Sequence, residues 1–141
     1  MKRIYSKVEP DKLLHIIKTY DDVVSQSDPR EDVVPDDNFI QCSTLKMDNG
    51  KTFRPHYHIL KDIDRESIAQ ESWVVIKGKV KFIFYDLDHE IIDTCVLNEG
   101  DISFTLYGGH TYEVLQDDTI VYEYKTGPYY GQQFDKRFID E

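Results

Sequence analysis

The sequence predicts an all-β protein, a sandwich or a barrel, because short strand-like segments follow one another at regular intervals. Between residues 39 and 126 such a segment recurs roughly every 8–12 residues, with polar turns in between. The chain is also rich in aromatic side chains that favour strands, with ten Tyr and seven Phe. No segment of helical periodicity of any length occurs in the same region.

Composition and charge limit the classes of partner. The 141 residues suffice for one domain with its own core. The formal net charge of −10 argues against binding to nucleic acid or to an anionic membrane surface, since both need clustered Lys and Arg. No apolar run of about 18 residues is present to span a membrane, and residues 1–12 lack the apolar stretch of a signal peptide. We therefore expect a cytoplasmic protein whose Cys42 and Cys95 are reduced.

Residues 1–37 are predicted to form an N-terminal arm ahead of the barrel. The β-branched residues in the sequence LLHII, residues 13–17, favour an edge strand over a helix. Residues 21–37 contain seven acidic residues and two prolines, which is typical of an irregular, solvated connection.

The barrel is predicted over residues 38–126. Its first strand, 38–47, should end in the turn Asp48-Asn49-Gly50, because Asn-Gly readily takes positive φ. A strand over 51–60 and a charged loop over 59–70 follow. Further strands are expected at 72–76, 80–86, 91–97, 102–107, 110–116 and 119–125. Residues 127–141 begin with Gly-Pro, and we expect a strap that packs on the barrel exterior rather than a flap over its mouth.

Two histidines one residue apart, His56 and His58, suggest half of a metal site. Side chains alternate along a strand, so the two imidazoles share one face at a spacing of about 7 Å. Such a pair can bind one metal ion with little backbone strain. If the alternation is unbroken, Arg54 lies on the same face and Tyr57 points away.

The spacing of residues around this pair resembles the first motif of the cupin superfamily, in particular its small, single-domain, RmlC-like members. Gly50, five residues, His56-Tyr-His58, then Glu71, six residues and Gly78 follow the order of that motif. The resemblance implies a double-stranded β-helix, or jelly-roll barrel. It also implies that a fourth ligand from the other sheet completes the site.

The second cupin motif is matched more loosely by Gly100, five residues, Leu106-Tyr-Gly108 and His110. Leu106 stands where the family has Pro, His110 comes one residue early, and Val114 stands where the family has Asn. The resemblance implies that His56, His58, Glu71 and His110 bind one divalent transition metal. Three imidazoles and a carboxylate suit Fe, Mn, Ni, Co or Zn and leave positions open for a substrate.

The spacer between His58 and Glu71 is twelve residues long, whereas the family has three or four. A long loop at the mouth of the barrel would leave the ligand set intact. Alternatively, Asp64, Glu66 or Gln70 replaces Glu71, or no acid is used at all. Some members of the family have lost the metal and use the same pocket for acid–base chemistry on sugars.

The walls of the pocket follow from strand alternation. If Glu71 and His110 point inward, so do Trp73, Val75 and Tyr112. Tyr112 is then a candidate general acid, and Arg54 a candidate anchor for a substrate carboxylate or phosphate. On the strand 119–125 either Val121, Glu123 and Lys125 or the alternate residues face the interior.

The resemblance and the aromatic walls together suggest a metal-dependent enzyme. Its reaction would be the isomerisation or epimerisation of a small polar metabolite, such as a carbohydrate or a nucleotide-linked sugar. The alternatives are an Fe(II)-dependent dioxygenase and a non-catalytic cupin that binds a small molecule. We expect a homodimer, since pairing through an edge strand or an exchanged arm covers an exposed sheet edge.

Overall fold

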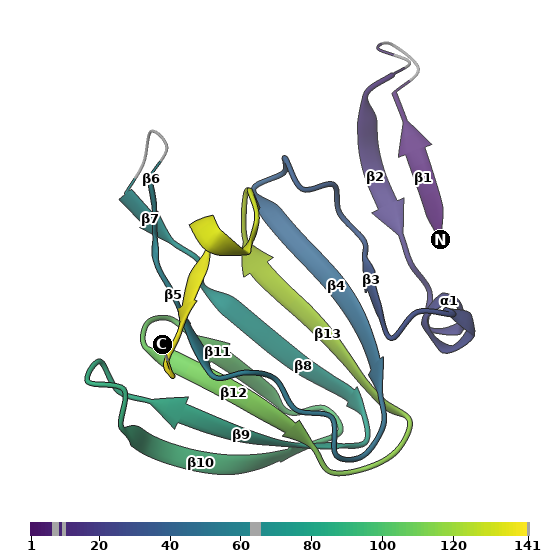
Figure 1. The fold of residues 1–141 in the computed structure, drawn as a ribbon. Helices are drawn as coiled ribbons and strands as arrows, with labels where there is room; N and C mark the ends of the chain where they lie inside the picture. The colour runs from purple at the N-terminus through teal and green to yellow at the C-terminus, as the bar shows by residue number, and fades with distance from the viewer. Residues whose placement is uncertain (7–8, 10, 63–65, 141) are drawn as a thin grey trace.

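A computed structural model of the chain describes residues 1–6, 9, 11–62 and 66–140. In these residues two five-stranded antiparallel sheets form the body of the molecule (Figure 1), which confirms the all-β prediction. The first sheet contains, in spatial order, β10 (Ile91–Asn98), β9 (Lys79–Tyr85), β12 (Gly109–Val114), β5 (His56–His58) and β14 (Lys136–Phe138). The second contains β11 (Ile102–Thr105), β8 (Glu71–Lys77), β13 (Thr119–Thr126), β4 (Ile40–Met47) and β3 (Arg30–Asp32).

The hydrophobic core lies between the two sheets, because alternate side chains of each strand point inward. Trp73, Val75 and Tyr112 are buried, as the alternation predicts. On β13 Val121 and Glu123 are buried and Lys125 lines the cavity between the sheets, whereas of the alternate residues Ile120 is buried and Tyr124 is exposed, so the face of Val121, Glu123 and Lys125 points inward. Burial of a large apolar side chain stabilises the fold by roughly 1.5–3 kcal/mol each. The buried cluster consists of Leu45, Met47, Trp73, Val75, Val80, Phe82, Tyr112, Val114 and Val121.

The N-terminal segment is more ordered than its composition predicts. The strand expected at LLHII is present as β2 (Leu13–Ile17), which pairs with β1 (Lys2–Tyr5) in a hairpin beside the barrel (Figure 1). The prediction that 21–37 is irregular is wrong. The helix α1 (Tyr20–Ser25) begins one residue before this segment, and β3 lies entirely within it. Thr19 and Asp22 form a reciprocal capping box that starts the helix, and β3 pairs with β4.

The histidine strand is much shorter than expected. Of the predicted 51–60, β5 takes only His56–His58, because Pro55 interrupts the segment just before it. The predicted loop over 59–70 instead contains a hairpin, in which β6 (Leu60–Asp62) pairs with β7 (Glu66–Ile68). This hairpin extends beyond the two sheets (Figure 1).

We expected the C-terminal segment to pack on the exterior of the barrel, but it joins one of the two sheets. After the 3-10 turn η1 (Gln132–Phe134), strand β14 pairs with β5 and becomes an edge of the first sheet. Lys136 lies opposite His58 and Phe138 opposite His56, so the last strand runs directly beside the histidines (Figure 1). Among the described residues, no helix has the length and apolar character that crossing a membrane requires.

Candidate metal centre

Four buried side chains meet between the sheets. They are His56 and His58 on β5, His110 on β12 and Glu71 on β8. One ligand atom from each lies within 4.8 Å of the others. Two donors on one ion at about 2.1 Å from it can be at most about 4.2 Å apart, so small side-chain shifts suffice to close the set on an ion.

Strand register explains why these residues meet. His110 lies directly opposite His56 in the ladder between β12 and β5. The prediction that His110 comes from the other sheet is therefore wrong, and it is Glu71 that crosses from the second sheet. Tyr57, between the two histidines of β5, stacks on His89 at a ring-centroid distance of 4.9 Å and does not line the site.

Each imidazole is held through its Nδ1 atom, which leaves Nε2 facing the common space. His56 Nδ1 donates to the backbone carbonyl of Arg54 at 3.0 Å, and His58 Nδ1 lies 3.0 Å from the buried carboxylate of Asp135. His110 Nδ1 is 2.8 Å from the hydroxyl of Thr105. Partners of this kind fix the ring orientation and tautomer of metal-binding histidines.

Two of the inward-facing nitrogens lack the partners that buried polar groups normally have. The Nε2 atoms of His58 and His110 are buried and make no hydrogen bond. Each lies 3.4 Å from an oxygen of Glu71, in an arrangement that does not meet hydrogen-bond geometry. A buried carboxylate surrounded by imidazole nitrogens is costly unless a cation balances it. The donor set therefore suits a divalent transition metal.

The pKa shifts of His56 and Glu71 favour the forms that bind metal, whereas that of His58 favours the protonated form. Burial lowers the pKa of His56 to about 3, and the nearby His110 and Lys136 add to this effect, so its imidazole is neutral. Burial would raise the pKa of Glu71, but the imidazoles of His110 and His58 outweigh it and hold that pKa well below its usual value. Burial also opposes protonation of His58, yet Asp135 and Glu71 raise its pKa, so a metal competes with a proton there.

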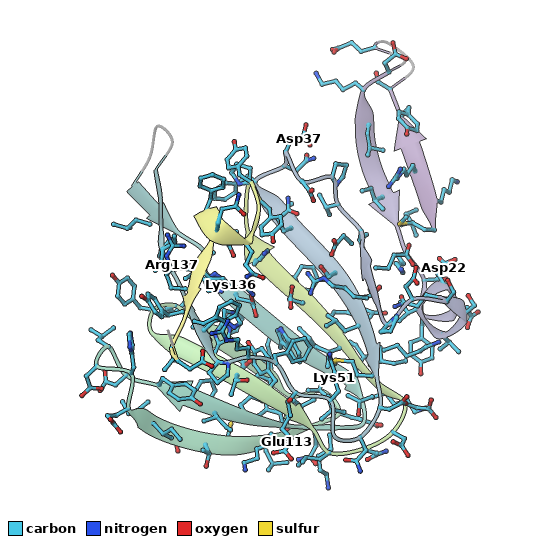
Figure 2. All side chains as sticks on the ribbon, viewed as in Figure 1. Asp22, Asp37, Lys51, Glu113, Lys136 and Arg137 are labelled. Carbon is cyan, nitrogen blue, oxygen red and sulfur yellow. The ribbon has the colours of Figure 1, made fainter. Side chains whose placement is uncertain are left out.

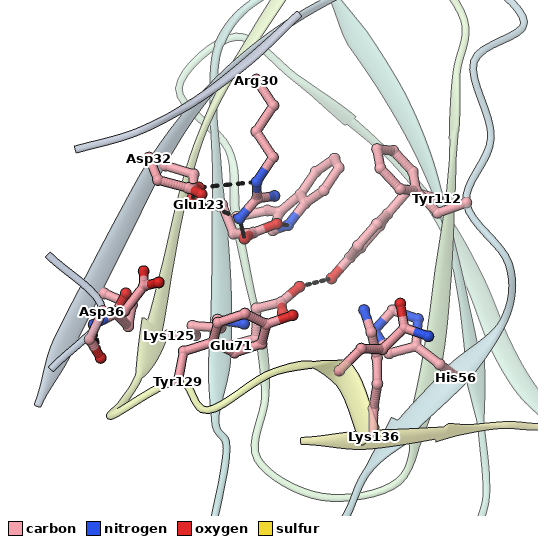
Figure 3. Close-up of a pocket in the computed structure, with 15 residues that line it drawn as sticks. Arg30, Asp32, Asp36, His56, Glu71, Tyr112, Glu123, Lys125, Tyr129 and Lys136 are labelled. Atoms are coloured by element: carbon pink, nitrogen blue, oxygen red, sulfur yellow. Dashed lines mark hydrogen bonds and ion pairs between the residues drawn. The ribbon is translucent and has the colours of Figure 1, made fainter. Parts of the chain in front are cut away.

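A cavity of about 170 Å³ lies against two of the four side chains, His56 and Glu71 (Figure 3). At about 30 Å³ per water, it has room for some six waters or a small metabolite. Its polar walls come from both sheets and from the C-terminal segment. The lining residues are Arg30, Asp32, Asp36, Gln41, Ser43, Phe53, His56, Glu71, Trp73, Tyr112, Glu123, Lys125, Tyr129, Gln132 and Lys136.

The far wall of this cavity is a closed network of polar groups (Figure 3). The guanidinium of Arg30 contacts Glu123 at 2.7 Å and Asp32 at 3.0 Å. The other carboxylate oxygen of Glu123 accepts a hydrogen bond from the indole of Trp73 at 3.1 Å. Ser43 joins Arg30 to Asp32 through hydrogen bonds of 2.6 and 2.7 Å. These charged groups satisfy one another without a ligand.

Solved structures resemble the fold of this chain, although no protein-family model matches the sequence and no curated protein matches it either. KdgF from Halomonas sp. superposes with a TM-score of 0.55 and 17% identity, over 72% of this chain and 84% of that one. CapF from Staphylococcus aureus superposes with a TM-score of 0.60 and 20% identity, over 77% of this chain and 31% of that one. Oxalate decarboxylase from Bacillus subtilis gives 0.56 and 14%, over 71% and 24%.

The chain has the cupin fold. It spans most of the length of KdgF but only about a third of CapF and a quarter of oxalate decarboxylase. At these identities the likeness shows the fold alone.

Within this cupin fold, Tyr112 lies where the sequence places it. Its ring stacks on Trp73 at 3.7 Å and its hydroxyl donates to Glu71 Oε1 at 3.1 Å. Burial raises the pKa of Tyr112 well above its usual value, and the carboxylates of Glu71 and Glu123 raise it further. The side chain therefore carries its proton beside both the ligand cluster and the cavity.

Arg54 does not share the inward face with the histidines, contrary to the alternation argument. Its guanidinium pairs with Asp140 at 2.8 Å and lies 3.8 Å from the ring centre of Phe138. It is exposed and does not line the cavity. Pro55 breaks the alternation between Arg54 and the strand, which accounts for the difference. A role in holding a substrate stays a prediction that these contacts do not support.

The carboxylate of the ligand cluster belongs to Glu71, whereas Gln70 is exposed. Asp64 and the side chain of Glu66 lie outside the described residues. Sequence reasoning missed Asp135 and Lys136, which β14 brings beside His58 and His56. The signal that could have found them is the short segment Asp135–Phe138, in which charged residues stand next to an aromatic one after a turn.

Proposed function

We propose that the protein is a metal-dependent enzyme that isomerises or epimerises a small polar metabolite, such as a carbohydrate. The observation that carries this proposal is a buried cluster of three imidazoles and one carboxylate, open to a small cavity with polar walls. Small-molecule sites commonly combine a few convergent polar groups in this way.

The chemistry divides between the metal and the chain. A divalent ion bound by His56, His58, Glu71 and His110 would supply Lewis-acid polarisation of a substrate carbonyl or hydroxyl. Tyr112 keeps its hydroxyl proton next to that position and would donate a hydrogen bond to the substrate oxygen as negative charge develops there. Trp73 and Phe53 cover the same region and would exclude water from it.

The size of the cavity narrows the substrate class. Drug-sized ligands occupy pockets of roughly 300–1,000 Å³. The cavity of about 170 Å³ suits a free metabolite better than a nucleotide-linked sugar. CapF is described as a capsular polysaccharide assembling protein, which agrees with a carbohydrate substrate by analogy of fold only. Oxalate decarboxylase contains Mn(II) centres, so Mn is among the metals to test first.

Isotope exchange tests the reaction class. The metal-loaded protein is incubated in D₂O with aldoses, ketoses and sugar acids, and carbon-bound protons are followed by NMR. Isomerisation or epimerisation through proton transfer replaces a proton next to the carbonyl with deuterium. The Tyr112→Phe variant keeps all four ligands, so at a saturating metal concentration it should be fully loaded and yet exchange more slowly.

Other outcomes of the same experiment would overturn the proposal. Oxygen consumption by the iron-loaded protein without deuterium exchange would identify a dioxygenase, for which the same ligand set is suitable. Ligand binding with neither reaction would indicate a binding cupin.

We further propose that the protein is a homodimer. The outer strands of both sheets, β10 and β14 in one and β11 and β3 in the other, leave edges that a second copy could cover. Light scattering coupled to size exclusion would give twice the chain mass of 16.6 kDa. A mass of one chain across the micromolar range would contradict the dimer.

A further inference from the structure

One cation in the cavity lies against the ligand cluster. Lys136 on β14 points toward the space between the sheets, whereas its neighbour Arg137 points to the outside (Figure 2). The Lys136 Nζ atom lies 3.3 Å from His56 Nε2, the nitrogen that faces the metal position (Figure 3).

Lys136 differs from the other cations of the cavity in its partners. Arg30 is paired with Glu123 and Asp32. Lys125 is 3.5 Å from Asp135 and lies over the ring of Tyr129. Among the described residues that line the cavity, Lys136 alone is a cation with no carboxylate within ion-pair distance. A half-buried ammonium whose direct partner is a neutral imidazole and not a carboxylate is costly, so the site favours an anion.

Metal binding strengthens this preference. A divalent ion at His56 Nε2 and the Lys136 ammonium would be close neighbours of the same sign. Glu71 is the one anionic group in the ligand set. A negatively charged group between the ion and Lys136 would contact both cations and balance the remaining charge.

We propose that the substrate of this site is a small acid, and that Lys136 binds its carboxylate beside the metal. This inference rests on the proposed function and sharpens it, since it replaces a neutral sugar with a hydroxy or keto acid. Lys136 thereby takes the anchoring role that the sequence suggests for Arg54. The cavity has room for a carboxylate with a short polyhydroxy chain, but not for a nucleoside diphosphate.

Matched pairs of ligands test the proposal by calorimetry on the Mn(II)-loaded protein. D-gluconate is compared with sorbitol, and D-glycerate with glycerol, because each pair differs only in a carboxylate. The acids should bind at least about tenfold more tightly than the alcohols, as expected for a charge-assisted hydrogen bond. Glycerol phosphate serves as the third probe, and tighter binding of this phosphate than of both acids would overturn the choice of carboxylate.

Three variants identify the residue responsible. Lys136→Met should remove the preference for acids, and Lys136→Arg should keep most of it. Lys81→Met is the matched control, because Lys81 pairs with Glu113 at 3.8 Å and does not line the cavity. In addition, Lys136→Met should bind Mn(II) as tightly as the unmodified protein or more tightly, since a positive charge next to the ion is removed. A preference for acids that survives in Lys136→Met would overturn the proposal.

Titrations of the metal-free protein separate this inference from the proposed function. Lys136 is present without the ion, so ligand-observed NMR should still detect weak binding of gluconate and none of sorbitol. If the protein binds no metal, the proposed function fails. The preference of the metal-free protein for gluconate over sorbitol then still tests the role of Lys136. Equal binding of acid and alcohol to both forms would overturn the inference and leave a metal-dependent enzyme for neutral substrates.

Discussion

The two ends of the cavity are both lined with buried polar side chains, yet they differ in how those side chains are satisfied. At the far end, Arg30, Glu123 and Asp32 form a closed set of ion pairs and hydrogen bonds. At the near end the ligand cluster reaches the cavity through His56 and Glu71, and the Nε2 atoms of the other two histidines, His58 and His110, have no hydrogen-bond partner. Buried polar groups that lack a hydrogen-bond partner within the protein commonly bind a ligand or an ion.

The comparison assigns different roles to the two ends. The near end should determine metal binding with little effect on folding, because the Nε2 atoms of His58 and His110 contribute no hydrogen bonds to the fold. The far end should stabilise the fold with little effect on the metal. Substitutions at each end test this distinction.

The largest effect is expected from His58→Ala. Loss of a direct ligand should weaken metal binding by more than the roughly 10–100-fold that loss of a supporting residue costs. The purified variant should contain less than about a tenth of an equivalent of metal by elemental analysis. Its circular dichroism spectrum should be that of the unmodified barrel. Full metal content in His58→Ala would show that the ligand set is wrong.

A smaller effect on the same end is expected from Asp135→Asn. Asp135 contacts His58 Nδ1 and fixes the orientation of that ring. Its loss should weaken metal affinity by about 10–100-fold, measured by competition with a chelator of known affinity. Asp140→Asn is the matched control, since Asp140 is exposed on the same segment and pairs with Arg54. Equal affinities of the two variants would mean that Asp135 does not support the metal.

At the far end, Glu123→Gln should lower stability instead. Its carboxylate joins Arg30 to the indole of Trp73, and hydrogen bonds to charged groups contribute about 1.5–3 kcal/mol. Because Arg30 is partly exposed, we expect a loss near the lower figure in urea unfolding, with metal content unchanged. Glu113→Gln, at an exposed ion pair, should have almost no effect. Loss of metal in Glu123→Gln would contradict the division of roles.

The smallest effect is expected from Arg54→Ala. Its ion pair with Asp140 is exposed, and such pairs contribute about 0–1 kcal/mol. The variant should unfold at nearly the same urea concentration and bind gluconate with unchanged affinity. A large loss of acid binding in Arg54→Ala, with none in Lys136→Met, would restore Arg54 as the anchor.

The ligand residues at the near end could be predicted from the sequence, whereas part of their arrangement could not. His56, His58, Glu71 and His110 could be found because strand alternation and motif spacing are local, and their inward direction follows from the pleat. The sheet that holds His110 could not be found, since it depends on long-range pairing with β5. Arg54 was misplaced because Pro55 ends the alternation that the argument assumed.

The C-terminal contribution was hidden for a related reason. Nothing in the sequence of residues 127–141 states which edge the last strand pairs with. Only its pairing with β5 brings Asp135 and Lys136 to the histidines. The helix α1 was missed although its capping box, Thr19 with Asp22, is visible in the sequence.

The central claim is that His56, His58, Glu71 and His110 bind one metal ion, and anomalous diffraction tests it most directly. Crystals of protein purified without added metal are measured on both sides of the Mn, Fe and Zn absorption edges. We predict a single anomalous peak about 2.0–2.2 Å from three Nε2 atoms and one oxygen of Glu71. No peak at this position after soaking in Mn(II), Fe(II) and Zn(II), or a peak whose carboxylate ligand is not Glu71, would contradict the account.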